Sequence, residues 1–176
     1  INENLKINNY TLLRKTKQIN ATSIIGKGEK DIFLSKIISL PENSSKIWKL
    51  TKLSTSAKIT TLNLTSSKAF ASGYVYITAN YKTISTINDK SYYGKVNYIE
   101  AILPFSTDII INTYNDIVKN TDVCQVINPC SISEKHILEN PTLSSNNELL
   151  YDKINEQLIL NIKIIITRDE EITIYI

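Results

Sequence analysis

The feature that most constrains this chain is a run of alternating side chains between Lys68 and Tyr81. Small and aliphatic residues occupy every second position, and aromatic and polar residues fill the positions between them. Successive side chains of a β-strand point to opposite faces of its sheet, so this pattern predicts a long strand with one buried face. The inner face takes Ala71, Gly73, Val75, Ile77, Ala79 and Tyr81, and the outer face takes Phe70, Ser72, Tyr74, Tyr76, Thr78 and Asn80.

The same period of two recurs along the chain. Residues 95–111 alternate as well, and Pro104 within them has no N–H to donate, so this strand is expected at a sheet edge or at a bulge. The chain holds 31 isoleucines but only six alanines, which favours strands over helices. We therefore predict an all-β fold, a mostly antiparallel β-sandwich spanning residues 31–176. Shorter strands are expected at 32–40, 57–64, 157–167 and 172–176, the last two on either side of an acidic turn at 169–171.

Three segments depart from the strand pattern. One or two short helices are expected, at 46–52 behind an N-cap at Ser44 or Ser45, and at 112–119. Residues 1–30 are rich in Asn and Lys and have too little apolar content for a core of their own. We interpret them as an N-terminal arm that docks onto another subunit. Its candidate docking residues are Tyr10, Leu12 and Leu13.

The residues needed for catalysis are scarce. His136 is the only histidine and lies in a polar stretch, so a multi-histidine metal site is excluded. The segment Gly26-Lys27-Gly28 lacks the rest of a phosphate-binding loop and is interpreted as a flexible joint. We therefore expect no enzymatic activity, no metal and no cofactor. The net charge of +3 comes from scattered lysines, which argues against a nucleic-acid partner, and no run is long and apolar enough for a membrane span.

The order of segments resembles a known family. Ile38-Ser39-Leu40-Pro41 and Ile47-Trp48-Lys49-Leu50 precede the alternating strand with its glycine at Gly73, and the strand Ala101-Ile102-Leu103-Pro104-Phe105-Ser106 follows it. This order, closed by residues 155–166, is similar to the SPOCS-type domain of clostridial spore coat and spore-envelope proteins. The resemblance covers residues 31–167 and implies a non-enzymatic domain that assembles with itself and with other spore-surface proteins. It places the protein at the bacterial spore surface, in the coat, exosporium or an appendage. The excess of Ile, Asn and Lys, whose codons are AT-rich, agrees with a clostridial source.

Two other functions stay open. A carbohydrate- or host-surface-binding β-sandwich would use outward tyrosines as stacking platforms. Its candidate site is Tyr92 and Tyr93, next to Asn88 and Asp89. A pilin-like domain with an internal Lys–Asn isopeptide bond is the third hypothesis.

The two cysteines, Cys124 and Cys130, flank a turn at Asn128-Pro129. Three states are open for them: free buried thiols, an intrachain disulfide that closes this small loop, or disulfides between subunits that lock a polymer.

The C-terminal run is a short, uncharged and strongly β-prone strand made of Ile172, Thr173, Ile174, Tyr175 and Ile176. An exposed edge of this kind would be an aggregation hazard, so it must be paired with its own sheet or with a neighbour. We predict that this strand and the arm join subunits into a homopolymer, because strand addition supplies main-chain hydrogen bonds. A repeated head-to-tail contact that does not close builds a fibre.

Overall fold

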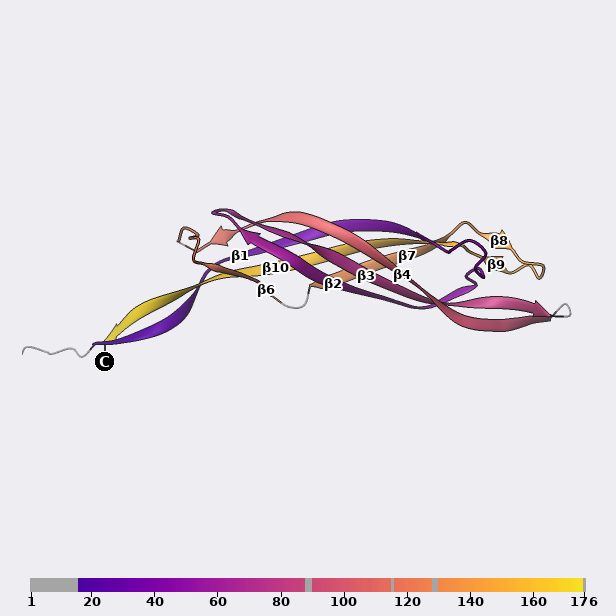
Figure 1. The fold of residues 1–176 in the computed structure, drawn as a ribbon, viewed down its shortest axis with the longest axis horizontal. Helices are drawn as coiled ribbons and strands as arrows, with labels where there is room; N and C mark the ends of the chain where they lie inside the picture. Colours follow the sequence, from indigo (N-terminus) through magenta and orange to yellow (C-terminus); the bar gives the residue numbers. More distant parts are fainter. Residues whose placement is uncertain (1–15, 88–89, 115, 128–129, 176) are drawn as a thin grey trace, which may run out of the picture.

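The computed structural model describes residues 16–87, 90–114, 116–127 and 130–175; within these ranges the side chains at 16, 85–87, 90–93, 131 and 175 are not described. The described chain is all-β and antiparallel, and its two larger sheets form an elongated sandwich (Figure 1). The predicted fold class is therefore confirmed, apart from its helices.

The larger sheet is built on a pair of very long strands, β1 (Thr16–Ser39) and β10 (Lys153–Tyr175), which are antiparallel neighbours over their whole length. The other edge of β10 is paired by β6 (Val123–Val126) and β7 (Ser131–Glu139). The other edge of β1 is paired only by β5 (Asn112–Thr113), at Gly26 and Lys27, among the described residues.

The smaller sheet has the order β2-β3-β4, with β2 (Lys49–Leu64), β3 (Lys68–Ile87) and β4 (Lys90–Ile110). The predicted alternation at 68–81 lies in β3, where Ala71, Val75 and Ile77 are at most 1% exposed. Pro104 lies on β4, which pairs only with β3 among the described residues, so its predicted edge position is confirmed. A short hairpin, β8 (Thr142–Leu143) with β9 (Leu149–Leu150), completes the fold.

The core lies between the inner faces of the two sheets. Alternate residues of β10 fill it from one side, and β3 contributes mainly small residues from the other. Burying this many branched aliphatic side chains is the main stabilising term of the fold. The fully buried aliphatic residues of β10 are Ile154, Leu158, Leu160, Ile162, Ile164 and Ile166.

Both predicted helices are wrong, since the described residues contain no helix. At 46–52 the backbone pairs instead: the Ile47 N–H donates to Tyr151 O at 2.8 Å, the Trp48 N–H donates to Lys82 O at 2.9 Å, and β2 begins at Lys49. At 112–119 the first two residues form β5. In both places a nearby strand edge satisfies the backbone groups that a helix would have satisfied internally.

The predicted acidic turn at 169–171 is also wrong, because β10 runs through it as one strand. Thr22 donates a hydrogen bond to Asp169 Oδ1 at 2.6 Å, and the Ser23 hydroxyl lies 3.5 Å from Glu170 Oε2. Solvent reaches this part of the strand, so acidic side chains are tolerated there without a turn.

Candidate assembly surfaces

The N-terminal end of β1 and the C-terminal end of β10 pair as a two-stranded ribbon, which projects beyond the sandwich at one end of the molecule (Figure 1). We call residues 16–24 with residues 167–175 the terminal ribbon; its register runs from Thr16↔Tyr175 to Ile24↔Thr167. The predicted C-terminal strand is therefore paired within its own chain, with residues 16–19 opposite residues 172–175. Ile176 lies outside the described residues.

The terminal ribbon has two open edges. In the described part of the chain, β5 reaches β1 only at Gly26 and Lys27, and the pairing of β6 with β10 stops at Thr167. The outer edges of the terminal ribbon therefore carry backbone N–H and C=O groups with no strand partner among the described residues beyond Thr167. Such edges are templates for pairing with another chain.

One face of the terminal ribbon continues the core face of the large sheet past the point where the small sheet ends. Ile162, Ile164 and Ile166 are 0% exposed, whereas Ile172 and Ile174 on the same face are each 38% exposed. The isoleucine pattern that fills the core thus continues into a region where the chain itself does not cover it.

A buried ion pair anchors the base of the terminal ribbon. Arg168 on β10 is 8% exposed and donates two hydrogen bonds to the carboxylate of Asp122, and its Nη2 also donates to Ile117 O at 2.8 Å. The hydrogen bonds from Arg168 hold the pKa of Asp122 below its usual range. The segment between β5 and β6 is thereby fixed where the terminal ribbon leaves the body.

The boundary predicted at residue 30 falls inside β1. Residues 16–30 are part of a strand of the large sheet, and Ile166, Ile164 and Ile162 of β10 supply apolar side chains opposite Gly26, Gly28 and Lys30. Gly26 and Gly28, interpreted from sequence as a flexible joint, lie in this strand. A Cβ at Gly28 would come within 2.8 Å of both Ile109 Cγ2 and Ile110 O, so the glycine allows close packing of the two sheets. The arm candidates Tyr10, Leu12 and Leu13 lie outside the described residues.

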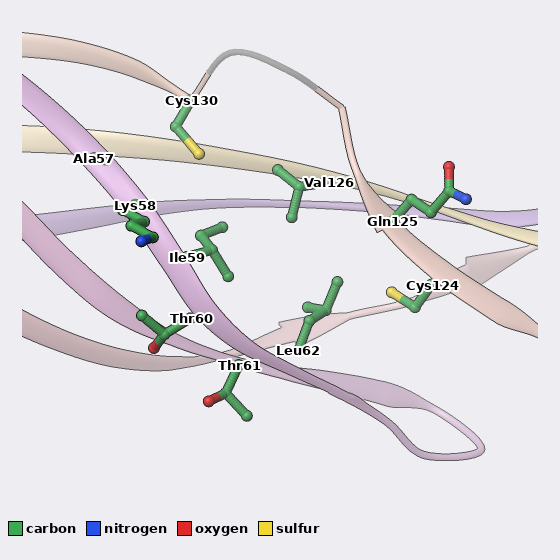
Figure 2. A pocket seen from close by; sticks show the side chains of 10 residues that line it. All are labelled: Ala57, Lys58, Ile59, Thr60, Thr61, Leu62, Cys124, Gln125, Val126 and Cys130. Carbon is green, nitrogen blue, oxygen red and sulfur yellow. The ribbon is translucent and has the colours of Figure 1, made fainter.

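Both cysteines line one cavity of about 530 Å³ at the side of the sandwich, between β2 and β6, with Cys130 before β7. Figure 2 shows their sulfur atoms directed into this cavity, with Ile59, Leu62 and Val126 on its walls. Both thiols are free, and burial raises the pKa of each. A raised pKa lowers the fraction of reactive thiolate at neutral pH.

The strand register keeps the two cysteines apart. Cys124 pairs with Ile166, and Ser131 pairs with Asn161, five residues earlier on β10. At about 3.3 Å per residue this is roughly 16 Å, so the Cα atoms of Cys124 and Cys130 are at least about 12 Å apart. A disulfide needs a Cα separation below about 7 Å. The intrachain disulfide is therefore absent from this fold and cannot form without backbone movement.

The glycan-site candidates Tyr92 and Tyr93 belong to β4, opposite Ser85 and Ile84 on β3, but their side chains lie outside the described part. The neighbouring residues 88 and 89 are outside it as well. The outward tyrosines of β3 are described: Tyr74 and Tyr76 are 41% and 40% exposed, beside Pro104 and Ile102 on β4.

Glu156 is a buried acidic residue that the sequence analysis missed. It is 0% exposed on the inner face of β10, and neither of its carboxylate oxygens has a hydrogen-bond partner among the described residues. Burial, followed by the charge of Glu134 on β7, raises its pKa to about 7. The signal in the sequence was an acidic residue between Ile154 and Leu158, at a position where the alternation predicts an apolar one.

His136 lies opposite Glu156 on β7 and is exposed. The described residues contain no group of three or more His, Cys, Asp or Glu side chains placed to hold a metal ion. Nor does the described part of the chain include a helix long and apolar enough to cross a membrane.

No family model, no curated protein and no solved structure matches this chain.

Proposed function

We propose that this protein is a non-enzymatic structural protein of the bacterial spore surface that assembles with copies of itself through its terminal strands. The resemblance to SPOCS-type domains and the AT-rich composition support the location. The absence of catalytic motifs from the sequence supports the structural role. Copies of the chain and other spore-surface proteins are its proposed partners.

The main observation in favour of self-assembly is the terminal ribbon with its open edges. A two-stranded ribbon on its own is marginally stable in water, because each strand leaves one row of backbone groups unpaired. An added strand from a neighbour would satisfy one of these rows, and its alternate side chains would fix the register. The exposed Ile172 and Ile174 offer apolar surface to the same neighbour.

The segment that we propose as the added strand is residues 1–15. It leads directly into Thr16 at the tip of the terminal ribbon. Fifteen residues span up to about 50 Å when extended, which is long enough to pair along most of a neighbouring strand.

The test is deletion of residues 1–15. Deleting all of residues 1–30 would also remove the strand partner of β10 from Ile162 to Tyr175, and would confuse loss of assembly with loss of folding. The shorter deletion should leave a β-rich monomer with a wild-type melting temperature that no longer forms polymers in negative-stain microscopy. Polymers of unchanged form from the truncated protein would contradict the strand-exchange proposal. A wild-type protein that stays monomeric at all concentrations would contradict self-assembly itself.

The location is tested separately. An antibody raised against the folded protein should label intact spores of the source organism and not its vegetative cells. Labelling confined to the vegetative cell would contradict the spore-surface proposal without bearing on self-assembly.

Carbohydrate binding is the second candidate, and the exposed aromatic face of the small sheet favours it. Tyr74 and Tyr76 lie on the outer face of β3, where flat rings can stack on sugars. A glycan array would test it: specific binding that is lost in Tyr74→Ala or in Tyr92→Ala would support this function. An array without signal would exclude it for the sugars present.

A further inference from the structure

The two outer edges of the terminal ribbon differ in charge. The β10 side has three consecutive acidic residues at 169–171, whereas the β1 side, residues 16–24, has one lysine and no acidic residue. The one basic residue of the β10 side, Arg168, is held by the buried carboxylate of Asp122, and its Nη1 lies 3.7 Å from Glu170 Oε1. We call the outer edge of β10 beyond Arg168 the acidic edge.

The two faces of the ribbon at the acidic edge present different groups. Successive side chains of a strand alternate, so Asp169 and Glu171 lie on one face, and Ile172 and Ile174 lie on the other. Glu171 is exposed and has no ion-pair partner among the described residues. Ile172 and Ile174 are each 38% exposed, and Ile172 lies opposite Ile19 of β1. A strand that fits this edge has a basic side chain on the first face and apolar side chains on the second.

The sequence of residues 1–15 has this pattern. It contains three basic residues and one acidic residue, so its side chains have a net charge of +2. Leu5 and Ile7 are on either side of Lys6. In an extended strand the two apolar side chains point to one face and Lys6 points to the other.

We infer that residues 1–15 of one copy add as a strand to the acidic edge of a second copy, with Lys6 on the face of Glu171. Alternation then places the apolar neighbours of Lys6 on the face of the exposed isoleucines, whichever way the added strand runs. Main-chain pairing supplies hydrogen bonds, the apolar face supplies burial, and the charges favour this edge over the outer edge of β1. This inference rests on the proposed self-assembly and deepens it, because it names the edge that accepts the segment.

The position of residues 1–15 in the chain favours a second copy over the same chain. The segment joins Thr16 at the tip of the terminal ribbon, on the β1 side, and the acidic edge of its own chain lies on the other side. To pair there the segment would have to turn back around the tip, and residues 11–16 contain no Gly, Asn, Asp or Pro for a tight turn. The acidic edge is about 23 Å long at about 3.3 Å per residue, which a segment of this length can cover.

The contact also determines the kind of assembly. Each copy has one donor segment and one acidic edge, and these are different parts of the chain, so the contact is head-to-tail. Contacts of this type propagate into filaments unless their rotation closes a ring.

A charge swap tests the inference. Glu171→Lys and Lys6→Glu each replace an attractive cross-strand pair by a repulsive one, so each variant should need about fivefold more protein than wild type to form sedimenting polymer. Glu171 is exposed, so the melting temperature of Glu171→Lys should stay close to wild type. The controls Glu100→Lys and Lys58→Glu make the same changes of net charge on the outer face of the small sheet and should assemble like wild type.

The decisive sample is an equimolar mixture of Glu171→Lys and Lys6→Glu. The segment of each variant has the charge opposite to the acidic-edge position of the other, so the mixture should assemble in alternation near the wild-type concentration. The double variant Lys6→Glu/Glu171→Lys should recover as well. If the double variant recovers and the mixture does not, the segment pairs within its own chain, and the inference is overturned.

The remaining outcomes separate this inference from the proposed function. If deletion of residues 1–15 abolishes assembly but both charge variants assemble like wild type, the choice of the acidic edge is overturned and strand exchange stands. A wild-type protein that never assembles would overturn the proposed function together with this inference.

Discussion

Arg168 and Asp122 form a buried ion pair in which Nε donates to Oδ1 at 2.7 Å and Nη2 donates to Oδ2 at 2.9 Å. The two residues are 46 positions apart in the sequence, and Asp122 also accepts a hydrogen bond from the Lys119 N–H at 2.8 Å. The pair therefore ties the segment before β6 to β10 at the point where the terminal ribbon leaves the sandwich.

Removing one partner should destabilise the fold strongly. Arg168→Leu leaves the Asp122 carboxylate buried without its counter-ion, and an uncompensated buried charge is costly. We expect the melting temperature to fall by several degrees. The matched control is Lys68→Leu, which removes the more exposed ion pair of Lys68 with Asp108 and should change the melting temperature little. An equal fall in melting temperature for the two variants would mean that the buried pair stabilises the fold no more than the exposed pair does.

The stability of the protein should depend on pH through Glu156. Its folded-state pKa of about 7 lies above the ordinary 4.5, so the folded state favours the neutral acid. The stabilisation is complete below pH 4.5, and it is lost as the pH rises from 4.5 through 7, because only the unfolded chain ionises freely in that range. The size of this loss is on the order of 3 kcal/mol.

Glu156→Gln should remove this dependence, because Gln does not titrate. The free energy of unfolding of wild type should fall relative to the variant between pH 4.5 and 7, and the difference should then level off. The titratable neighbours on its face are Glu134 and His136 on β7 and Lys36 on β1. Because His136 lies directly opposite Glu156 on β7, both proteins are also compared with His136→Gln added. If the free energy of unfolding has the same pH dependence in wild type and Glu156→Gln, the raised pKa of Glu156 is contradicted.

The sequence predicted those strands in which apolar and polar side chains alternate clearly enough to identify the buried face. In β3 every second residue from Ala71 to Tyr81 is buried, and the alternation alone located that face. Only the part of β1 from residue 32 onward was predicted as a strand; the part before it could not be found in this way, because at Gly26 and Gly28 its inner face has no side chain. The residues opposite these two glycines are Ile166 and Ile164 of β10, more than 130 positions further along the sequence. The helix predicted at 46–52 failed for a similar reason, since its backbone partners Tyr151 and Lys82 are distant in the sequence.

Oxidation should not produce a disulfide within one chain. The register of β6 and β7 on β10 separates Cys124 and Cys130 beyond bonding distance, and both thiols are free. After mild air oxidation, the monomer should keep its full reduced mass and show two titratable thiols once it is unfolded. Any disulfide product should be a covalent dimer or larger species on a non-reducing gel. A monomer lighter by two hydrogen atoms would show that the loop between the cysteines rearranges.

Gly73 should be intolerant of even one added methyl group. A Cβ at this position of β3 would collide with Lys58 O and come within 2.9 Å of the Ile59 Cα, both backbone atoms of β2. The register between the two strands shifts just after this point, between Ile59 and Thr61, so β2 bends toward the space that the glycine leaves open. Gly73→Ala should push β2 away and lower the free energy of unfolding by about 1–3 kcal/mol, the usual cost of overpacking. The neighbouring Ser72→Ala is the matched control, since this side chain lies on the outer face, and it should unfold like wild type in a urea titration. Gly73→Ala with wild-type stability would mean that β2 and β3 do not approach each other this closely.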